Sequence, residues 1–219
     1  MTPKFDLFVF DWDGTLMDTT GAIAEGIVYA FEKVGYAHPG IEATKRIIGT
    51  DWMRAIYSLV PDFRSEDYEV FEAAYREKYI AAEREIKLFD GMRELLEAMN
   101  ARGLPCAIAT GKSRRGMKRV FELTGIGHLF VDTVTADEAR AKPDPMILEL
   151  LAERNGVDIG QCVMIGDTAY DIEMAKAAGA ACVTVSFGAY PREELARHHV
   201  PVADTVEELK SHLGLDDIL

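Results

Sequence analysis

The chain has 219 residues, of which 48% are hydrophobic and 28% are charged. This length suits one large domain or a core with a smaller unit, and the apolar share is enough to bury a core. The formal net charge of −13 would repel nucleic-acid phosphates, so we expect no nucleic-acid partner. No apolar run approaches the roughly 20 residues that span a bilayer, and no signal layout begins the sequence. We therefore expect a cytoplasmic protein with no membrane segment.

The cysteines and histidines show no pattern of a metal or nucleophile site. The three cysteines are widely spaced within apolar runs, which is typical of reduced core thiols. The five histidines lack metal-ligand spacing, so we interpret them as surface residues. These residues are Cys106, Cys162, Cys182, His38, His128, His198, His199 and His212.

An apolar run near the start of the chain ends in two aspartates. Leu7 to Phe10 include no polar residue, which predicts a strand buried on both faces. Asp11 and Asp13 follow directly, and Gly14 permits a tight reversal that a residue with a Cβ resists. Open α/β sheets bind ligands at the carboxyl ends of their strands, so this pair is a candidate site. Taken alone, the stretch also fits a turn with two solvated aspartates.

A helical block without any strand signal follows. The expected helices lie at about 20–34, 41–48, 51–59 and 65–85. The last of these helices carries an aromatic stripe, which we interpret as a packing face rather than a cofactor site. The stripe consists of Tyr68, Phe71, Tyr75 and Tyr79.

The position of this block predicts two structural units. Residues 17–86 would form a helical cap inserted after the first strand, and residues 1–16 and 87–219 would form the core. The crossings near 16–20 and 86–91 would act as hinges. The segment Gly49-Thr50-Asp51 joins two cap helices. It either reaches over the site and selects the substrate, or it simply ends one helix and begins the next.

From residue 90 onward, strands and helices alternate. The expected strands lie at 105–110, 129–135, 161–167 and 181–185. The expected helices lie at 91–102, from about 112 to 123, from Pro143 onward, at 170–178, and near 191–198 and 205–213. Together with the first strand, five strands alternating with helices predict an α/β fold with a doubly wound, Rossmann-like parallel sheet.

Polar residues collect where these strands end. The first strand is followed by Asp11 and Asp13, and the second is followed by Thr110-Gly111-Lys112. Shortly after the third strand comes Lys142-Pro143. The fourth strand is followed by Gly166-Asp167-Thr168, and Asp171 lies one helical turn later. In a parallel sheet these ends share one edge, so carboxylates, a hydroxyl and a lysine should meet there.

This set of side chains suits phosphoryl transfer by covalent catalysis. Asp11 can attack phosphorus to form an acyl phosphate, and Asp13 can protonate the leaving oxygen and later deprotonate water. Asp167 and Asp11 would supply oxygen ligands for Mg²⁺. Thr110 and Lys142 would hold the phosphoryl oxygens. Asp171 would not bind the ion directly, but would hold a metal-bound water or Lys142 in place.

The four motifs resemble those of the haloacid dehalogenase superfamily. Asp11-Trp12-Asp13-Gly14-Thr15, Thr110-Gly111, Lys142-Pro143 and Gly166-Asp167 with Asp171 match in order and spacing. The resemblance implies a Rossmann-like core, an aspartate nucleophile, a phosphate-binding Thr110-Gly111 segment, and Mg²⁺ held partly by the main-chain carbonyl of Asp13. The inserted block looks like the cap of the phosphoglycolate phosphatase-like branch. Dehalogenases and phosphonatases of the superfamily lack the second aspartate, so Asp13 indicates phosphate esters.

The resulting hypothesis is a Mg²⁺-dependent phosphatase of a small phosphorylated metabolite, acting as a monomer or homodimer. The main alternative is a sugar phosphomutase of the β-phosphoglucomutase type, which shares the fold. A signalling receiver domain fits less well, because its phosphorylated aspartate ends a middle strand and it has no inserted cap. Lys112, Arg114 and Arg115 either touch an anionic substrate or form a solvated helix start.

Overall fold

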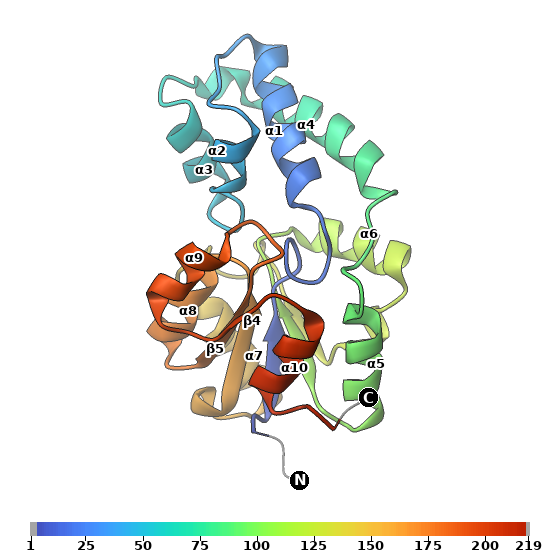
Figure 1. Ribbon diagram of the computed structural model, residues 1–219. Coiled ribbons are helices and arrows are strands. Elements are labelled where there is room, and N and C mark those ends of the chain that lie inside the picture. The colour runs from blue at the N-terminus through green and yellow to red at the C-terminus, as the bar shows by residue number, and fades with distance from the viewer. Residues whose placement is uncertain (1–3, 218–219) are drawn as a thin grey trace.

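The computed structural model describes residues 4–217, and its centre is a six-stranded parallel sheet (Figure 1). The strand order is β3-β2-β1-β4-β5-β6, so the first strand lies in the middle. The strands are β1 Leu7–Phe10, β2 Cys106–Ala109, β3 Asp132–Val134, β4 Cys162–Gly166, β5 Ala181–Val185 and β6 Val202–Ala203. The expected α/β, doubly wound sheet is confirmed.

The sheet is covered on both faces by helices, which explains the uninterrupted apolar run of β1. Phe8 and Phe10 belong to one hydrophobic cluster with α5, α6 and α10. Leu7 and Val9 belong to a second cluster with α7, α8 and α9. The covering helices are α5 Met92–Ala101, α6 Arg114–Thr124, α7 Met146–Asn155, α8 Ala169–Ala178, α9 Arg192–Leu195 and α10 Val206–Leu213. Alternating side chains of β1 thus point into two different cores.

Four further helices gather beyond the carboxyl edge of the sheet, at the top of Figure 1. They are α1 Thr20–Val34, α2 Ile41–Lys45, α3 Trp52–Leu59 and α4 Tyr68–Glu83. Their apolar side chains form a separate hydrophobic cluster, in which Phe31 and Phe71 are fully buried. This group of helices lies where the sequence places the cap.

The two chain segments that join these helices to the sheet run side by side. Met17 and Leu88 form an antiparallel bridge. The Asp18 amide donates to the Lys87 carbonyl at 3.1 Å, and the Phe89 amide donates to the Leu16 carbonyl at 3.0 Å. The two crossings therefore form one short, hydrogen-bonded ribbon.

Several boundaries differ from the expectations. Strand β6 was not expected, because a two-residue edge strand carries no periodic signal. Helix α7 begins at Met146 rather than Pro143. Its N-cap is Pro145, and the Asp144 carboxylate accepts from the Met146 amide at 3.1 Å. Strand β3 is shorter than expected because a 3₁₀ turn precedes it. The 3₁₀ turns are Ser65–Asp67, Gly127–Leu129, Ile159–Gln161 and Ala196–His198.

No helix within residues 4–217 is both long enough and apolar enough to cross a membrane.

Candidate active site

Three buried carboxylates meet at the carboxyl edge of the sheet. Asp11 follows β1 and Asp167 follows β4, and these strands are direct neighbours. Asp171 lies in the first turn of α8. One oxygen from each carboxylate lies within 4.8 Å of the others, and the residues are only 3%, 0% and 0% exposed. No other group of three or more acidic, histidine or cysteine residues within 4–217 has this geometry.

Lys142 is the cation that these carboxylates share. Its Nζ lies 2.9 Å from Asp11 Oδ2 and 2.7 Å from Asp171 Oδ1, and the residue is 2% exposed. Burial alone lowers the pKa of the Lys142 ammonium, but Asp11 and Asp171 outweigh this effect and raise it. Lys142 therefore carries its charge in the buried site.

A single lysine does not balance three carboxylates. Burial raises the pKa of Asp11 to about 7, and the charges of Asp171 and Asp13 add to this effect against the opposing pull of Lys142. Burial, followed by the charges of Asp171 and Asp11, also raises the pKa of Asp167 well above its ordinary value. A hard divalent cation would relieve this excess negative charge, and the oxygen donors present are those that Mg²⁺ prefers.

Asp167 is held by groups that the sequence analysis did not identify. Its Oδ1 accepts from the Thr15 hydroxyl at 3.0 Å, and its Oδ2 accepts from the Ala189 amide at 2.7 Å. A Cβ on Gly188 would lie 2.3 Å from Asp167 Oδ2, and one on Gly14 would lie 2.1 Å from it. The loop after β5 therefore closes against this carboxylate. In the sequence, the only indication of this role was that the loop follows β5 and therefore lies at the same edge of the sheet.

Asp171 is oriented by the start of its own helix. Its Oδ2 accepts from the Thr168 hydroxyl at 2.8 Å and the Thr168 amide at 3.1 Å, which forms a capping box. Its other oxygen contacts Lys142. Asp171 thus holds the ammonium of Lys142 in place, and its expected role in support of the metal stays a prediction.

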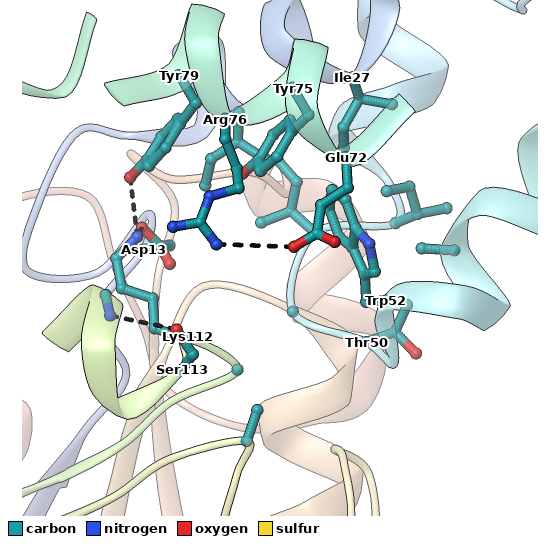
Figure 2. A pocket seen from close by; sticks show the side chains of 18 of the residues that line it. Asp13, Ile27, Thr50, Trp52, Glu72, Tyr75, Arg76, Tyr79, Lys112 and Ser113 are labelled. Atoms are coloured by element: carbon teal, nitrogen blue, oxygen red, sulfur yellow. Dashed lines mark hydrogen bonds and ion pairs between the residues drawn. The ribbon is translucent and has the colours of Figure 1, made fainter. Parts of the chain in front are cut away.

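Asp13 lies in a different environment from Asp11. Its Oδ1 accepts from the Thr19 hydroxyl at 2.6 Å and lies 2.8 Å from the Nζ of Lys112. The same ammonium donates to the Tyr79 hydroxyl at 2.8 Å (Figure 2). Lys112 therefore links the turn after β1 to helix α4.

Thr110 and Gly111 lie beside these residues, where β2 ends. Thr110 is fully buried and its hydroxyl accepts from the Lys112 amide at 3.1 Å. Gly111 lines the cavity that begins at Asp11 and Asp13. The structure thus brings together all the strand-end residues that the sequence placed at one edge.

The helices beyond the sheet line the rest of this cavity. Gly49 and Thr50 form part of its wall, but Asp51 does not. The Asp51 carboxylate instead accepts from the Arg54 amide at 2.8 Å and caps α3, which matches the second of the two interpretations left open for this segment. A Cβ on Gly49 would lie 3.5 Å from the Thr168 hydroxyl, which shows how closely the loop approaches the sheet edge.

The aromatic stripe and the basic start of α6 each divide into two groups. Phe71 is fully buried among the helices, as a packing residue, whereas Tyr68, Tyr75 and Tyr79 line the cavity. Arg115 also lines the cavity. The Arg114 guanidinium instead donates to the Thr133 carbonyl and pairs with Glu138, away from it. Helical spacing alone did not separate these roles.

Comparison with known proteins identifies the class. A family model described as a haloacid dehalogenase-like hydrolase matches residues 5–179. The chain belongs to this family of hydrolases, which confirms the resemblance drawn from its four motifs.

Individual relatives extend the comparison. A phosphoglycolate phosphatase of Vibrio parahaemolyticus is 28% identical, covering 93% of this chain and 93% of its own. One of Pseudomonas savastanoi is 30% identical, covering 83% of this chain and 70% of its own. The crystal structure of a hydrolase from Pseudomonas syringae is 26% identical, with a TM-score of 0.86, covering 96% of this chain and 98% of that one. These relatives agree with the expected phosphatase.

Proposed function

We propose that the protein is a cytoplasmic, Mg²⁺-dependent phosphatase that hydrolyses a small phosphorylated metabolite through an aspartyl phosphate. The observation that carries this proposal is the meeting of Asp11, Asp167, Asp171 and Lys142 at one sheet edge. Family membership and the names of the relatives support it.

In this proposal Asp11 is the nucleophile. A carboxylate oxygen of Asp11 attacks phosphorus, the ester bond to the alcohol breaks, and the phosphoryl group stays on Asp11. Lys142, Thr110 and Gly111 hold the phosphoryl oxygens. Lys142 suits this task because its charge lies 2.9 Å from the attacking carboxylate, where the phosphate must arrive.

Asp13 moves the protons. It gives a proton to the departing alkoxide, and then takes one from the water that attacks the aspartyl phosphate and releases inorganic phosphate. Its side chain lines the cavity, and contacts with Thr19 and Lys112 fix Oδ1. Its Oδ2 has no hydrogen-bond partner within residues 4–217, so it can exchange a proton with a ligand.

The site fits Mg²⁺ because its carboxylates exceed its cations. Asp11, Asp167 and the main-chain carbonyl of Asp13 would hold the ion, with Asp171 in support. When bound, Mg²⁺ offsets the repulsion between the anionic nucleophile and an anionic phosphate. Thr15 and the Ala189 amide orient Asp167 for this purpose.

We further propose that residues 17–86 act as a cap domain over a core of residues 1–16 and 87–219. The separate hydrophobic cluster of α1–α4 and the paired crossings at Met17 and Leu88 support this division. A two-stranded ribbon can bend as a hinge while its hydrogen bonds keep the two crossings in register. Closure over the cavity would exclude water and position the ester.

The test measures inorganic phosphate released from p-nitrophenyl phosphate and from a panel of phosphorylated metabolites. Wild-type protein should lose turnover in EDTA and regain it with Mg²⁺, while Asp11→Asn should fall to background. A mutase would isomerise a sugar phosphate without releasing phosphate, so both products are counted. Full turnover in metal-free buffer, or wild-type turnover by Asp11→Asn, would refute the proposal.

A further inference from the structure

The cavity above the carboxylates is larger than a very small substrate requires. It has a volume of about 430 Å³ and reaches from Asp11 and Asp13 into the space between α1, α3, α4 and α6 (Figure 2). Pockets of roughly 300–1,000 Å³ typically hold ligands of drug size. The cavity has room for a leaving group of ring size.

One wall of the cavity is aromatic. The rings of Trp52 and Tyr75 lie 4.7 Å apart, and those of Tyr75 and Tyr79 are stacked at 5.6 Å with an interplanar angle of 6°. Isoleucines complete the apolar lining, namely Ile23, Ile27, Ile47, Ile48 and Ile80. Such surfaces bind the flat, apolar face of a ring. No hydrogen bond of the Tyr75 hydroxyl is seen within residues 4–217. Every buried polar side-chain atom of these residues has a hydrogen-bond partner, so the Tyr75 hydroxyl is not buried. It therefore faces the cavity that Tyr75 lines.

The cations of the cavity wall are already occupied. Lys112 pairs with Asp13, Arg119 with Glu83, and Arg76 with Glu72. Glu83 is fully buried, so a substrate that drew Arg119 away would leave this carboxylate with only Lys112, whose Nζ lies 4.0 Å from it. An anionic leaving group that used Lys112 or Arg119 would therefore have to break an existing ion pair. The Arg76–Glu72 pair is exposed, so water screens it and an anion bound to Arg76 would gain little.

Arg115 is the exception, but its position makes it a weak anchor. It lines the cavity, and no ion pair of its side chain is seen within residues 4–217. Its side chain is exposed, and water screens the attraction of an exposed charge. A carboxylate bound there would gain little.

We propose that the natural leaving group is an uncharged alcohol built on a ring, either a sugar ring or an aryl alcohol, rather than a small carboxylic acid. Its apolar face would stack on the wall of Trp52 and Tyr75, and a ring hydroxyl would meet the Tyr75 hydroxyl. This inference rests on the proposed phosphatase function and adds the chemical class of the substrate.

The experiment compares four esters with the Mg²⁺-loaded wild-type protein and with Thr50→Trp. The esters are phosphoglycolate, glycerol 2-phosphate, glucose 6-phosphate and phenyl phosphate. In the variant, an indole replaces a small side chain of the cavity wall. We expect wild-type kcat/KM to be at least tenfold higher for glucose 6-phosphate than for phosphoglycolate if the ring is a sugar. Phenyl phosphate has a more acidic leaving group, so the aryl source is identified only by a larger loss on phenyl phosphate than on glucose 6-phosphate in the variant. Thr50→Trp should lower kcat/KM for the ring ester so identified at least tenfold more than for phosphoglycolate.

Because both enzymes are compared on the same ester, the effect of the leaving alcohol's acidity on kcat/KM cancels in their ratio. The matched control is Val70→Trp, which adds the same side chain to an outward position of α4 that is 59% exposed. This control should leave all four values within twofold. A higher wild-type kcat/KM for phosphoglycolate than for both ring esters overturns the inference, even if Thr50→Trp does not fold. An equal loss of kcat/KM on all esters in a folded Thr50→Trp variant also overturns it. No phosphate release from any ester, p-nitrophenyl phosphate included, overturns the proposed phosphatase function itself.

Discussion

Removal of the metal should make the protein less stable as pH rises through neutrality. Burial, reinforced by the charges of Asp171 and Asp13, raises the pKa of Asp11 to about 7 from its ordinary value of 3.8. Without a metal, the folded protein therefore binds a proton at Asp11 more tightly than the unfolded chain does. A group with a raised folded-state pKa contributes stability that is complete at low pH and is lost as pH rises toward the folded value.

The size of the effect follows from this pKa. One pKa unit corresponds to about 1.36 kcal/mol, so the free energy of unfolding should fall by about 2 kcal/mol between pH 5 and pH 7. For a chain of this length, that corresponds to a decrease in Tm of about 4–8 °C. Saturating Mg²⁺ should remove most of the decrease, because the ion would take the place of the proton beside Asp11 and Asp167.

Thermal unfolding in EDTA and in Mg²⁺, across pH 5 to 7.5, measures this effect. The matched control is Asp11→Asn, whose side chain has the same shape but does not ionise. Its metal-free stability should depend on pH less steeply than that of the wild type by about 2 kcal/mol over the same range. Identical pH slopes for the wild type and Asp11→Asn without metal would refute the reasoning.

Three further predictions concern neighbouring residues. Asp13→Asn should lower turnover by about 10²–10⁴ and accumulate phosphoryl enzyme, seen as added mass on the peptide containing Asp11; phosphate on another residue would reject the assignment. Lys112→Met should lower kcat by about 10–100-fold with unchanged Mg²⁺ affinity, because Asp13 loses its partner, whereas the exposed Lys118→Met should have no effect. Gly188→Ala should weaken Mg²⁺ activation by about 10–100-fold, because the new Cβ would displace Asp167. The control is Gly21→Ala, which adds its Cβ to open space. Equal Mg²⁺ titrations for the two variants would contradict this prediction.

The sheet edge could be predicted because strand ends are local features of the sequence. The apolar run before Asp11 and the run before Asp167 each identify a strand, and parallel strands place their carboxyl ends together. The order of the motifs then indicated the family. The roles given to these residues stay predictions, because the structure shows their positions and not their chemistry.

The contacts between the helices and the sheet edge could not be predicted in the same way. Helical periodicity shows that Phe71, Tyr75 and Tyr79 share a face of α4, but it does not show where that face meets the core and where it meets a cavity. The pairing of Lys112 with Tyr79 depends on how α4 lies over α6. Such contacts join residues far apart in the chain, and no local pattern encodes them.

The same limit applies to the loop that closes on Asp167. Gly188 and Ala189 follow β5 at the correct edge, yet a glycine after a strand is common and has many uses. Only the structure shows that a Cβ there would collide with Asp167 Oδ2 and with the carbonyl of Gly14. The glycine is needed because two backbone segments and a carboxylate approach each other closely.

The turn after β1 explains how two aspartates only two residues apart obtain different surroundings. Trp12 lies between them and is fully buried, with its Nε1 donating to the Met17 sulfur at 3.3 Å and its ring edge-on to Phe121. The amides of Leu16 and Met17 both donate to the Trp12 carbonyl, so the turn is anchored at its centre. This anchor leaves Asp11 among the buried carboxylates and Asp13 at the cavity wall. In the proposed mechanism, the nucleophile must lie close to the metal and the proton carrier must reach the leaving oxygen. One anchored turn would meet both requirements.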